Sequence, residues 1–211
     1  MTRFAIVLGL CAIILTLPAP AHADPGSDAY NRGDYGKAIE AWRKEAYSNP
    51  QFAYNLGYMY ETGQGTTPDP QEAFKWYEEA ARDARGDGYK ELKRDAVHAL
   101  VRIVITTKNP KRIATASKYI STHAMKTGNP LSLRYRGLLM EFQADDSIAR
   151  KIRNAQNPME AAYGYLRVAA ERGSTAAKAE ASRVFKKVKD KQAAKRAVKR
   201  TRKELKRNGV K

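Results

Sequence analysis

Apolar residues recur with a helical period along most of the chain, and many of them are small. Between residues 50 and 62, Ala53, Leu56, Gly57 and Tyr60 follow the spacing i, i+3, i+4 and i+7, which places them on one helix face. A second helix is predicted over residues 70–84 by apolar residues of similar spacing, namely Ala73, Trp76, Tyr77, Ala80 and Ala81. One such hairpin cannot bury its own apolar stripe, so the pattern predicts stacked copies.

The predicted helix starts are marked by Asn or Asp followed by Pro. The pairs are Asn49-Pro50, Asp69-Pro70, Asn109-Pro110, Asn129-Pro130 and Asn157-Pro158. An Asn or Asp side chain accepts a hydrogen bond from a free amide of the first turn, and proline at the first helical position loses none. We therefore predict helices near 26–32, 34–48, 50–62, 70–84, 89–107, 110–127, 130–153 and 158–172. The β-branched run over residues 101–107 is included because no second strand is available to pair with it.

The predicted helices repeat along the chain. Ala38, Trp42 and Ala46 precede Ala73, Tyr77 and Ala81 by a constant 35 residues. A third copy follows the second at an offset of 89 residues and comprises Ala162, Tyr165, Ala169 and Ala170. Residues 112–124 form a degenerate copy, and residues 131–142 have the composition of another first helix. The pattern predicts an all-α chain of about four stacked antiparallel helical hairpins.

The segment 53–81 resembles the Sel-like repeat, a relative of the tetratricopeptide repeat. In that family the first helix carries Ala, Leu-Gly and Tyr, which are matched here by Ala53, Leu56-Gly57 and Tyr60. A glycine-containing loop and a second helix with Ala, an aromatic pair and Ala-Ala follow. The matching residues are Gly63, Gly65, Ala73, Trp76-Tyr77 and Ala80-Ala81. The resemblance implies an α-solenoid, a short right-handed superhelix with one concave surface, that acts as a protein-binding scaffold.

The first 23 residues have the composition of a cleaved signal peptide. Arg3 precedes an apolar run over residues 4–17, and Ala21-His22-Ala23 supplies small residues at the positions that a signal peptidase reads. The run is short for a membrane span, which needs roughly 20 residues; an uncleaved anchor is the alternative. The only cysteine, Cys11, lies in this segment. We therefore expect a periplasmic or secreted chain with a repeat domain over 24–177 and a basic helix or tail over 178–211.

Positive charge is concentrated in that basic C-terminal segment. Residues 178–211 hold 15 Lys or Arg against 3 Asp or Glu, in a chain of net charge +17. A capping helix that frays beyond Phe185 is expected, because few apolar residues follow. Solvated capping, attachment to an anionic envelope polymer or membrane surface, and nucleic-acid binding are the three interpretations. Nucleic acid is the least favoured, because an exported protein seldom meets it and the tail has no aromatic residue besides Phe185. The candidate anion-binding residues are Lys186, Lys187, Lys195, Arg196, Lys199, Arg200, Arg202 and Lys203.

No catalytic pattern is found in the sequence. The histidines that follow residue 23, His98 and His123, have no carboxylate or second histidine three or four residues further along, so neither predicts a metal site. Both are interpreted as core or surface histidines. With the only cysteine in the signal segment, thiol catalysis is not expected. No activated-serine motif is present, and the glycine pairs at 63–65 and 86–88 fit helix-connecting turns. We predict no catalytic residue, no metal and no cofactor.

A candidate partner-binding face lies on the first helix of the best repeat. If Leu56 and Tyr60 face the core, then Tyr54, Asn55, Tyr58, Met59 and Glu61 point elsewhere. Exposed aromatic and Met side chains are typical binding anchors; packing against the preceding repeat is the alternative. The predicted function is a non-catalytic periplasmic adaptor that binds other proteins. The alternative is an envelope factor that binds anionic glycan or lipid through its tail, and an enzyme acting on cell-wall glycan comes third.

Overall fold

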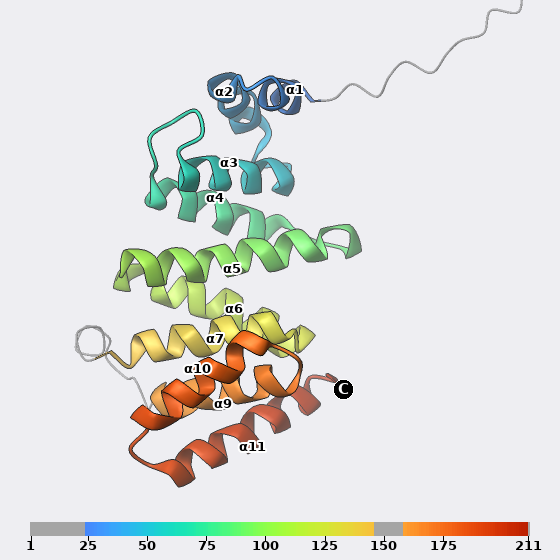
Figure 1. Ribbon diagram of the computed structural model, residues 1–211. Helices are drawn as coiled ribbons and strands as arrows, with labels where there is room; N and C mark the ends of the chain where they lie inside the picture. The colour runs from blue at the N-terminus through green and yellow to red at the C-terminus, as the bar shows by residue number, and fades with distance from the viewer. Residues whose placement is uncertain (1–23, 146–157, 211) are drawn as a thin grey trace, which may run out of the picture.

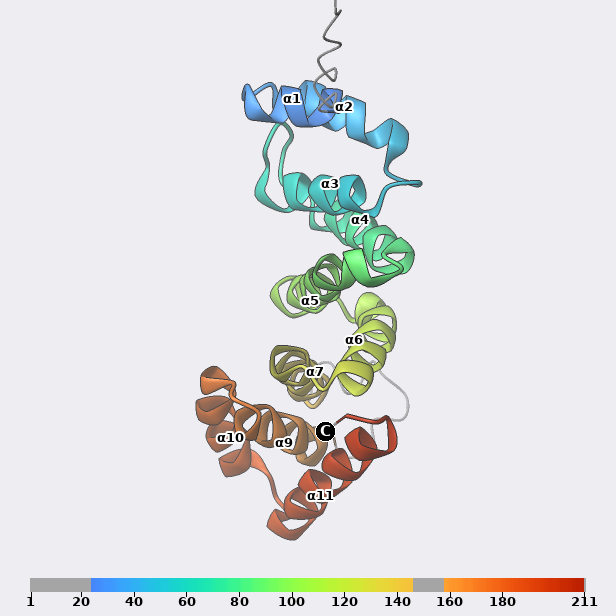
Figure 2. The ribbon, with the colours of Figure 1, turned by 90° about the vertical axis from the view of Figure 1, so that its right-hand side faces the viewer.

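The computed structural model describes residues 24–145 and 158–210, and these residues form helices without any strand. The predicted signal segment and the proposed cap Asn157 lie outside the described residues. Over residues 24–145 the helices are stacked in chain order into an elongated column, with the N-terminal hairpin at one end and the C-terminal helices gathered at the other (Figures 1 and 2). This arrangement confirms the prediction of an all-α solenoid.

The helix bounds agree with the predicted ranges at most boundaries. The helices are α1 (Pro25–Asn31), α2 (Tyr35–Glu45), α3 (Pro50–Thr62), α4 (Pro70–Asp83), α5 (Lys90–Thr107), α6 (Ile113–Thr127), α7 (Pro130–Gln143), α9 (Pro158–Glu171), α10 (Thr175–Lys187) and α11 (Lys191–Arg207). Short 3-10 turns, η1 (Asp87–Tyr89) and η2 (Pro110–Arg112), precede α5 and α6. The β-branched run 101–107 is helical, as predicted. Helix α7 ends at Gln143, earlier than the predicted residue 153.

The predicted Asx-Pro caps are formed wherever the structure describes them. Asn49 and Asn109 each accept one backbone N–H at 3.0 Å, from Gln51 and Lys111. Asp69 and Asn129 each accept two backbone N–H groups from the first turns of α4 and α7. These caps determine where each helix begins, and so they set the lengths of the connections between helices.

Each hairpin packs against the next, and the buried apolar residues form two clusters. Residues of α1 to α7 form the first, which includes Trp42, Tyr77 and Leu100. A second cluster runs from α6 to α11 and includes Leu166 and Val184. The predicted core residues Ala53, Leu56 and Tyr60 are buried.

A glycine in α3 lets that helix lie close to α4. A Cβ atom at Gly57 would be 2.7 Å from Cδ1 of Tyr77, so the aromatic ring lies directly on the helix backbone. The ring of Tyr77 is fully buried, and its hydroxyl donates to Glu61 at 2.8 Å. The Tyr77 ring therefore cannot move away from a methyl group added at Gly57. Gly26 lies under the ring of Trp42, and Gly137 under Leu166, in the same way.

The C-terminal segment differs from the single fraying helix that we predicted. Helix α10 begins at Thr175, before the expected boundary at 178, and a new helix, α11, starts after the cap Asp190. Asp190 accepts backbone N–H groups of Gln192 and Ala193 at 2.8 and 2.9 Å. Both helices pack on α9. The buried stripe of α11 consists of Ala194, Ala197, Val198, Thr201 and Leu205. The expectation of fraying was wrong because small residues suffice for burial where α9 offers Gly164 beneath Ala197.

The close contact at Gly57 gives the first testable prediction. Gly57→Ala should lower the free energy of unfolding by about 1–2 kcal/mol, because the new methyl group overlaps the Tyr77 ring. The matched control is Gly36→Ala in α2, where an added Cβ meets nothing within 4 Å. That control should be neutral or up to about 1 kcal/mol more stable, because Ala favours helix over Gly. Urea unfolding followed by circular dichroism measures both. Equal stability of the two variants would contradict the packing argument.

Candidate functional site

A groove lined by aromatic and amide side chains lies between the first two hairpins. Its volume is about 270 Å³. The residues that line it, called the aromatic groove below, come from α1, α2 and α3 and are Ser27, Tyr30, Asn31, Trp42, Tyr54, Asn55 and Tyr58. None of them carries a formal charge. The groove therefore favours contact with apolar or aromatic groups over binding of ions.

Hydrogen bonds and ring contacts hold two of the groove's aromatic side chains. Trp42 donates its Nε1–H to Asp24 Oδ1 at 2.8 Å, and Asp24 also caps α1. The hydroxyl of Tyr30 donates to Gln64 Oε1 at 3.0 Å, which ties α1 to the loop after α3. The rings of Tyr30 and Trp42 lie 5.6 Å apart between centroids. These contacts pre-organise the groove, so little conformational freedom remains to be lost on binding.

The structure brings three of the five predicted partner-binding residues together. Tyr54, Asn55 and Tyr58 all line the aromatic groove. Tyr58 is 41% exposed. Tyr54 is partly buried and meets the ring of Tyr77 edge-on, with centroids 5.3 Å apart. Tyr58 therefore faces solvent, whereas Tyr54 packs on Tyr77 of α4, in its own hairpin.

The expectations for Met59 and Glu61 were wrong. Met59 is 0% exposed, because it points into the core between hairpins and not to solvent. Glu61 accepts two hydrogen bonds from Arg102 of α5, at 2.9 and 2.6 Å, as well as the bond from Tyr77. The bond to Glu61 raises the pKa of Arg102, and burial raises the pKa of Tyr77. Glu61 therefore joins successive hairpins and is not a free anchor.

Sequence reasoning missed the part of the groove that comes from the first hairpin. Tyr30 and Ser27 lie in α1, and Trp42 in α2 was recognised only as a repeat match. The spacing of Trp42 predicted burial, and its ring is indeed buried. Its contribution to the groove wall depends on how the first hairpin sits against α3, which no local pattern in the sequence encodes.

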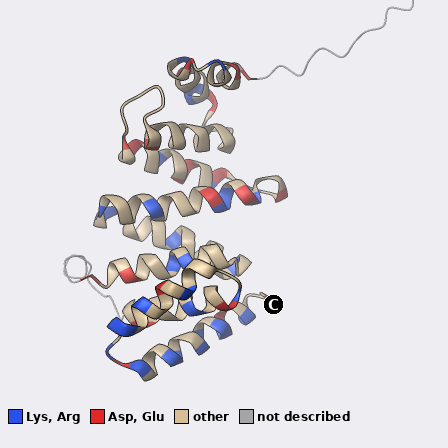
Figure 3. Cartoon of the chain, in the orientation of Figure 1, with Lys and Arg blue, Asp and Glu red and all other residues tan. Residues whose placement is uncertain are grey.

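The basic residues predicted for anion binding lie on α10 and α11. Figure 3 shows Lys and Arg along α11 at the end of the column. Three of them are paired, since Arg196 contacts Asp190 at 3.2 Å, Arg202 contacts Glu171 at 2.7 Å and Lys187 contacts Glu141 at 3.2 Å. The others are exposed and have no ion pair within the described part of the chain; they are Lys186, Lys195, Lys199, Arg200 and Lys203. The tail is thus a packed helix with a basic outer stripe.

The two histidines meet at a buried serine. His98 Nε2 lies 2.8 Å and His123 Nδ1 2.9 Å from Ser132 Oγ. Ser132 is fully buried, and His98 is stacked on Tyr135 with centroids 4.7 Å apart. A nucleophilic serine must be reachable by its substrate, and this hydroxyl is enclosed by the two rings that bind it. The cluster connects α5, α6 and α7, and it fits the interpretation of His98 as a core residue.

Over residues 24–145 and 158–210 there is no group of three His, Cys, Asp or Glu side chains that could hold a metal ion. Within the same ranges no helix is both long and apolar enough to cross a membrane.

Comparison with known proteins agrees with the repeat pattern. The family model of the Sel1 repeat matches residues 50–84 and 155–174. The chain therefore contains Sel1 repeats in these two segments. The first matched segment spans α3 and α4, and the second includes α9. A crystal structure of a Sel1 repeat protein from Oxalobacter formigenes is similar, with 21% identity, coverage of 87% of this chain and 83% of that chain, and a TM-score of 0.29. No curated protein matches the chain.

The buried histidines make the stability of this Sel1-repeat protein depend on pH. Burial, reinforced by His123, lowers the pKa of His98 from 6.5 to about 3. Burial also lowers the pKa of His123. Below about pH 6.5 the unfolded chain takes up protons that folded His98 does not, so the stability falls as pH falls. From pH 7.5 to pH 5, His98 should account for a loss of about 2 kcal/mol.

Urea unfolding of the wild type and of His98→Gln at both pH values tests this dependence. Glutamine keeps a hydrogen-bonding group near Ser132 but does not titrate, so the variant should lose about 2 kcal/mol less than the wild type between the two pH values. Lys44→Gln, on the exposed face of α2, is the control and should keep the full dependence. An unchanged dependence in His98→Gln would contradict the role of His98.

Proposed function

We propose that this protein is a non-catalytic adaptor that binds a protein partner in the aromatic groove, and that it does so after export to the periplasm. The observation that carries the proposal is the convergence of Tyr54, Asn55 and Tyr58 with Tyr30 and Trp42 in one uncharged groove. Sel1 repeats generally mediate protein–protein interactions. The signal-like segment over residues 1–23 supports the proposed compartment.

The chemistry of the groove indicates what part of a partner it would accept. Tyr and Trp are enriched at the energetic centres of interfaces, because they bury large areas with few rotatable bonds. A volume of about 270 Å³ accommodates one or two side chains and not a whole helix. Ser27, Asn31 and Asn55 supply hydrogen-bonding groups at its edge. The proposed ligand is therefore an apolar or aromatic side chain on a partner surface, with neighbouring backbone amides.

The lack of charge in the groove makes binding resistant to salt. Screening at high ionic strength weakens ion pairs but has little effect on apolar contacts. A partner held by the aromatic groove should therefore remain bound where partners held by the basic stripe of α11 are released.

Tyr58→Ala tests the proposal directly. Tyr58 is exposed and its hydroxyl has no hydrogen bond to another described residue, so its truncation should leave the fold intact. Loss of an interface anchor costs about 2 kcal/mol or more, so recovery of the partner from an envelope extract at about 0.5 M salt should fall at least tenfold. Tyr47→Ala is the matched control, because Tyr47 is 68% exposed and lies outside the groove.

The two outcomes of this comparison separate the interpretations. A protein retained by the wild type and by Tyr47→Ala, but lost with Tyr58→Ala, supports the adaptor. If no protein is retained at high salt, or if Tyr58→Ala retains the same proteins as the control, the aromatic groove is not the binding site.

A second candidate function is attachment to an anionic envelope polymer or membrane surface through α11. Lys195, Lys199 and Lys203 are spaced four residues apart, so they share one outer face, and none has an ion pair within the described residues. Truncation of the tail is unsuitable as a test, because α11 buries Val198 and Leu205 against α9. Charge-neutralising substitutions leave that packing in place.

The triple variant Lys195→Gln, Lys199→Gln, Lys203→Gln tests this second function. Binding to vesicles that contain phosphatidylglycerol should weaken by about 1 kcal/mol for each lysine near the surface. The control removes three exposed lysines that lie away from α11, by Lys37→Gln and Lys44→Gln in α2 and Lys111→Gln in η2. Cosedimentation at low and high salt measures both variants. Equal weakening by the two triples would show that overall charge, and not the α11 face, drives attachment.

A further inference from the structure

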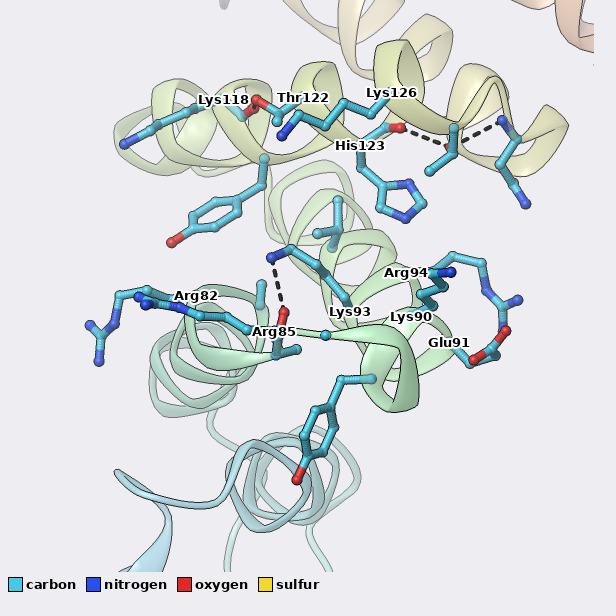
Figure 4. A pocket seen from close by; sticks show the side chains of 18 residues that line it. Arg82, Arg85, Lys90, Glu91, Lys93, Arg94, Lys118, Thr122, His123 and Lys126 are labelled. Carbon is cyan, nitrogen blue, oxygen red and sulfur yellow. Dashed lines mark hydrogen bonds between the residues drawn. The ribbon is translucent and has the colours of Figure 1, made fainter. Parts of the chain in front are cut away.

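A cavity of about 580 Å³ lies between the end of α4, the first half of α5 and the outer face of α6. Figure 4 shows that its lining side chains come from the three helices and from the connection that follows α4. Seven lining residues are Lys or Arg, and a single one, Glu91, is acidic. No residue of this cavity lines the aromatic groove, and it lies apart from the basic stripe of α11.

Three of the seven cations already have acidic partners. Arg94 contacts both carboxylate oxygens of Asp95, at 2.8 and 3.1 Å. Arg82 pairs with Glu79 and Asp83, and Lys90 pairs with Asp87 at 2.9 Å. These pairs use most of the carboxylates near the cavity, so they leave the other cations without a counter-charge.

Four cations in the cavity have no ion pair among the described residues: Arg85, Lys93, Lys118 and Lys126. They come from the connection after α4, from α5 and from α6. Lys93 Nζ lies near the middle of the close-up view and donates to the carbonyl oxygen of Ala84 at 3.0 Å (Figure 4). Burial lowers the pKa of Lys93, and the charges of Lys126 and Arg85 lower it further. Cations that repel each other in this way would be stabilised by a bound anion.

The apolar walls of the cavity strengthen the attraction between its cations and an anion. Ala81, Ala84, Val97 and the ring of Tyr119 supply apolar surface beside the ammonium groups. Attraction between opposite charges is stronger beside low-dielectric walls than in open water. The exposed stripe of α11 carries similar charges but has no enclosing wall.

We propose that this cavity binds a small ligand that carries two phosphate-type groups. Four uncompensated cations call for more than one anionic group, since a phosphate monoester carries about −1.5 to −2 charges near pH 7. Three of the four are lysines, which bind phosphate as point charges. The guanidinium groups of Arg82 and Arg94 are already occupied, so Arg85 is the one guanidinium among the four cations without a described ion pair. A volume of about 580 Å³ fits a small molecule and not a polymer segment.

Titration calorimetry of the full-length chain with inorganic tripolyphosphate at about 150 mM salt tests the proposal. The wild type should form a one-to-one complex. Lys118→Gln/Lys126→Gln should weaken it at least about tenfold, because two contacts to a charged group are lost. Both lysines are exposed on α6, and their ammonium groups make no hydrogen bond to a described residue, so the fold should be kept. Lys93→Gln provides a second pocket variant from a different helix.

The matched control removes the same charge from α11 by Lys195→Gln/Lys199→Gln and should change the affinity by less than about threefold, since exposed charges beyond a Debye length are screened. Citrate, a polycarboxylate, should bind at least about tenfold more weakly than tripolyphosphate. No binding by the wild type, equal weakening by the pocket and α11 pairs, or equal affinity for citrate would overturn the proposal.

A phosphate-type group can belong to a soluble molecule or to a lipid headgroup. Glucose 1,6-bisphosphate and vesicles that contain phosphatidic acid distinguish these sources. Binding of either that is lost in Lys118→Gln/Lys126→Gln but kept in the α11 control supports phosphate recognition and identifies the source. Binding of both that is insensitive to the pocket substitutions would overturn it.

Discussion

The close approach of paired helices is the constraint on which the rest of this structure depends. In three hairpins a large side chain of the second helix lies directly over a glycine of the first: Trp42 over Gly26, Tyr77 over Gly57 and Leu166 over Gly137. Any Cβ at these glycines would approach the opposite side chain below ordinary contact distance. Because the two helices of a hairpin lie close together, neighbouring hairpins can stack on both sides and bury the two apolar clusters. The same arrangement recurs at the end of the column, where Gly164 of α9 receives Ala197 of α11.

This spacing also decides which side chains reach the surface. The ring of Tyr77 fills the space beside Gly57 and supports Tyr54 from behind, so Tyr54 stands at the wall of the aromatic groove and not in the core. Glu61 and Arg102 join α3 to α5 and hold successive hairpins in register. The cationic cavity lies beside the connection between α4 and α5. Both candidate sites therefore lie where side chains of successive hairpins meet.

The basic residues that dominate the net charge are not the ones that form the cationic cavity. The C-terminal segment holds 15 Lys or Arg and dominates the composition. On α10 and α11 these residues lie on exposed faces, and Lys187, Arg196 and Arg202 are paired with Glu141, Asp190 and Glu171. The cavity between α4 and α6 has fewer cations, but they converge on one volume with apolar walls. A count along the sequence identified the first feature and could not identify the second.

The sequence by itself determined the helices, their starts and their core faces, because caps such as Asn49 and Asp69 and the spacing of Ala53, Leu56 and Tyr60 act within a few residues. It also indicated Tyr54, Asn55 and Tyr58 as surface candidates. Only the tertiary structure decided that Met59 is buried, that Glu61 is taken by Arg102, and that α11 packs on α9. These outcomes depend on contacts between residues tens of positions apart. Helical periodicity specifies which residues share a face, but it does not specify what lies against that face.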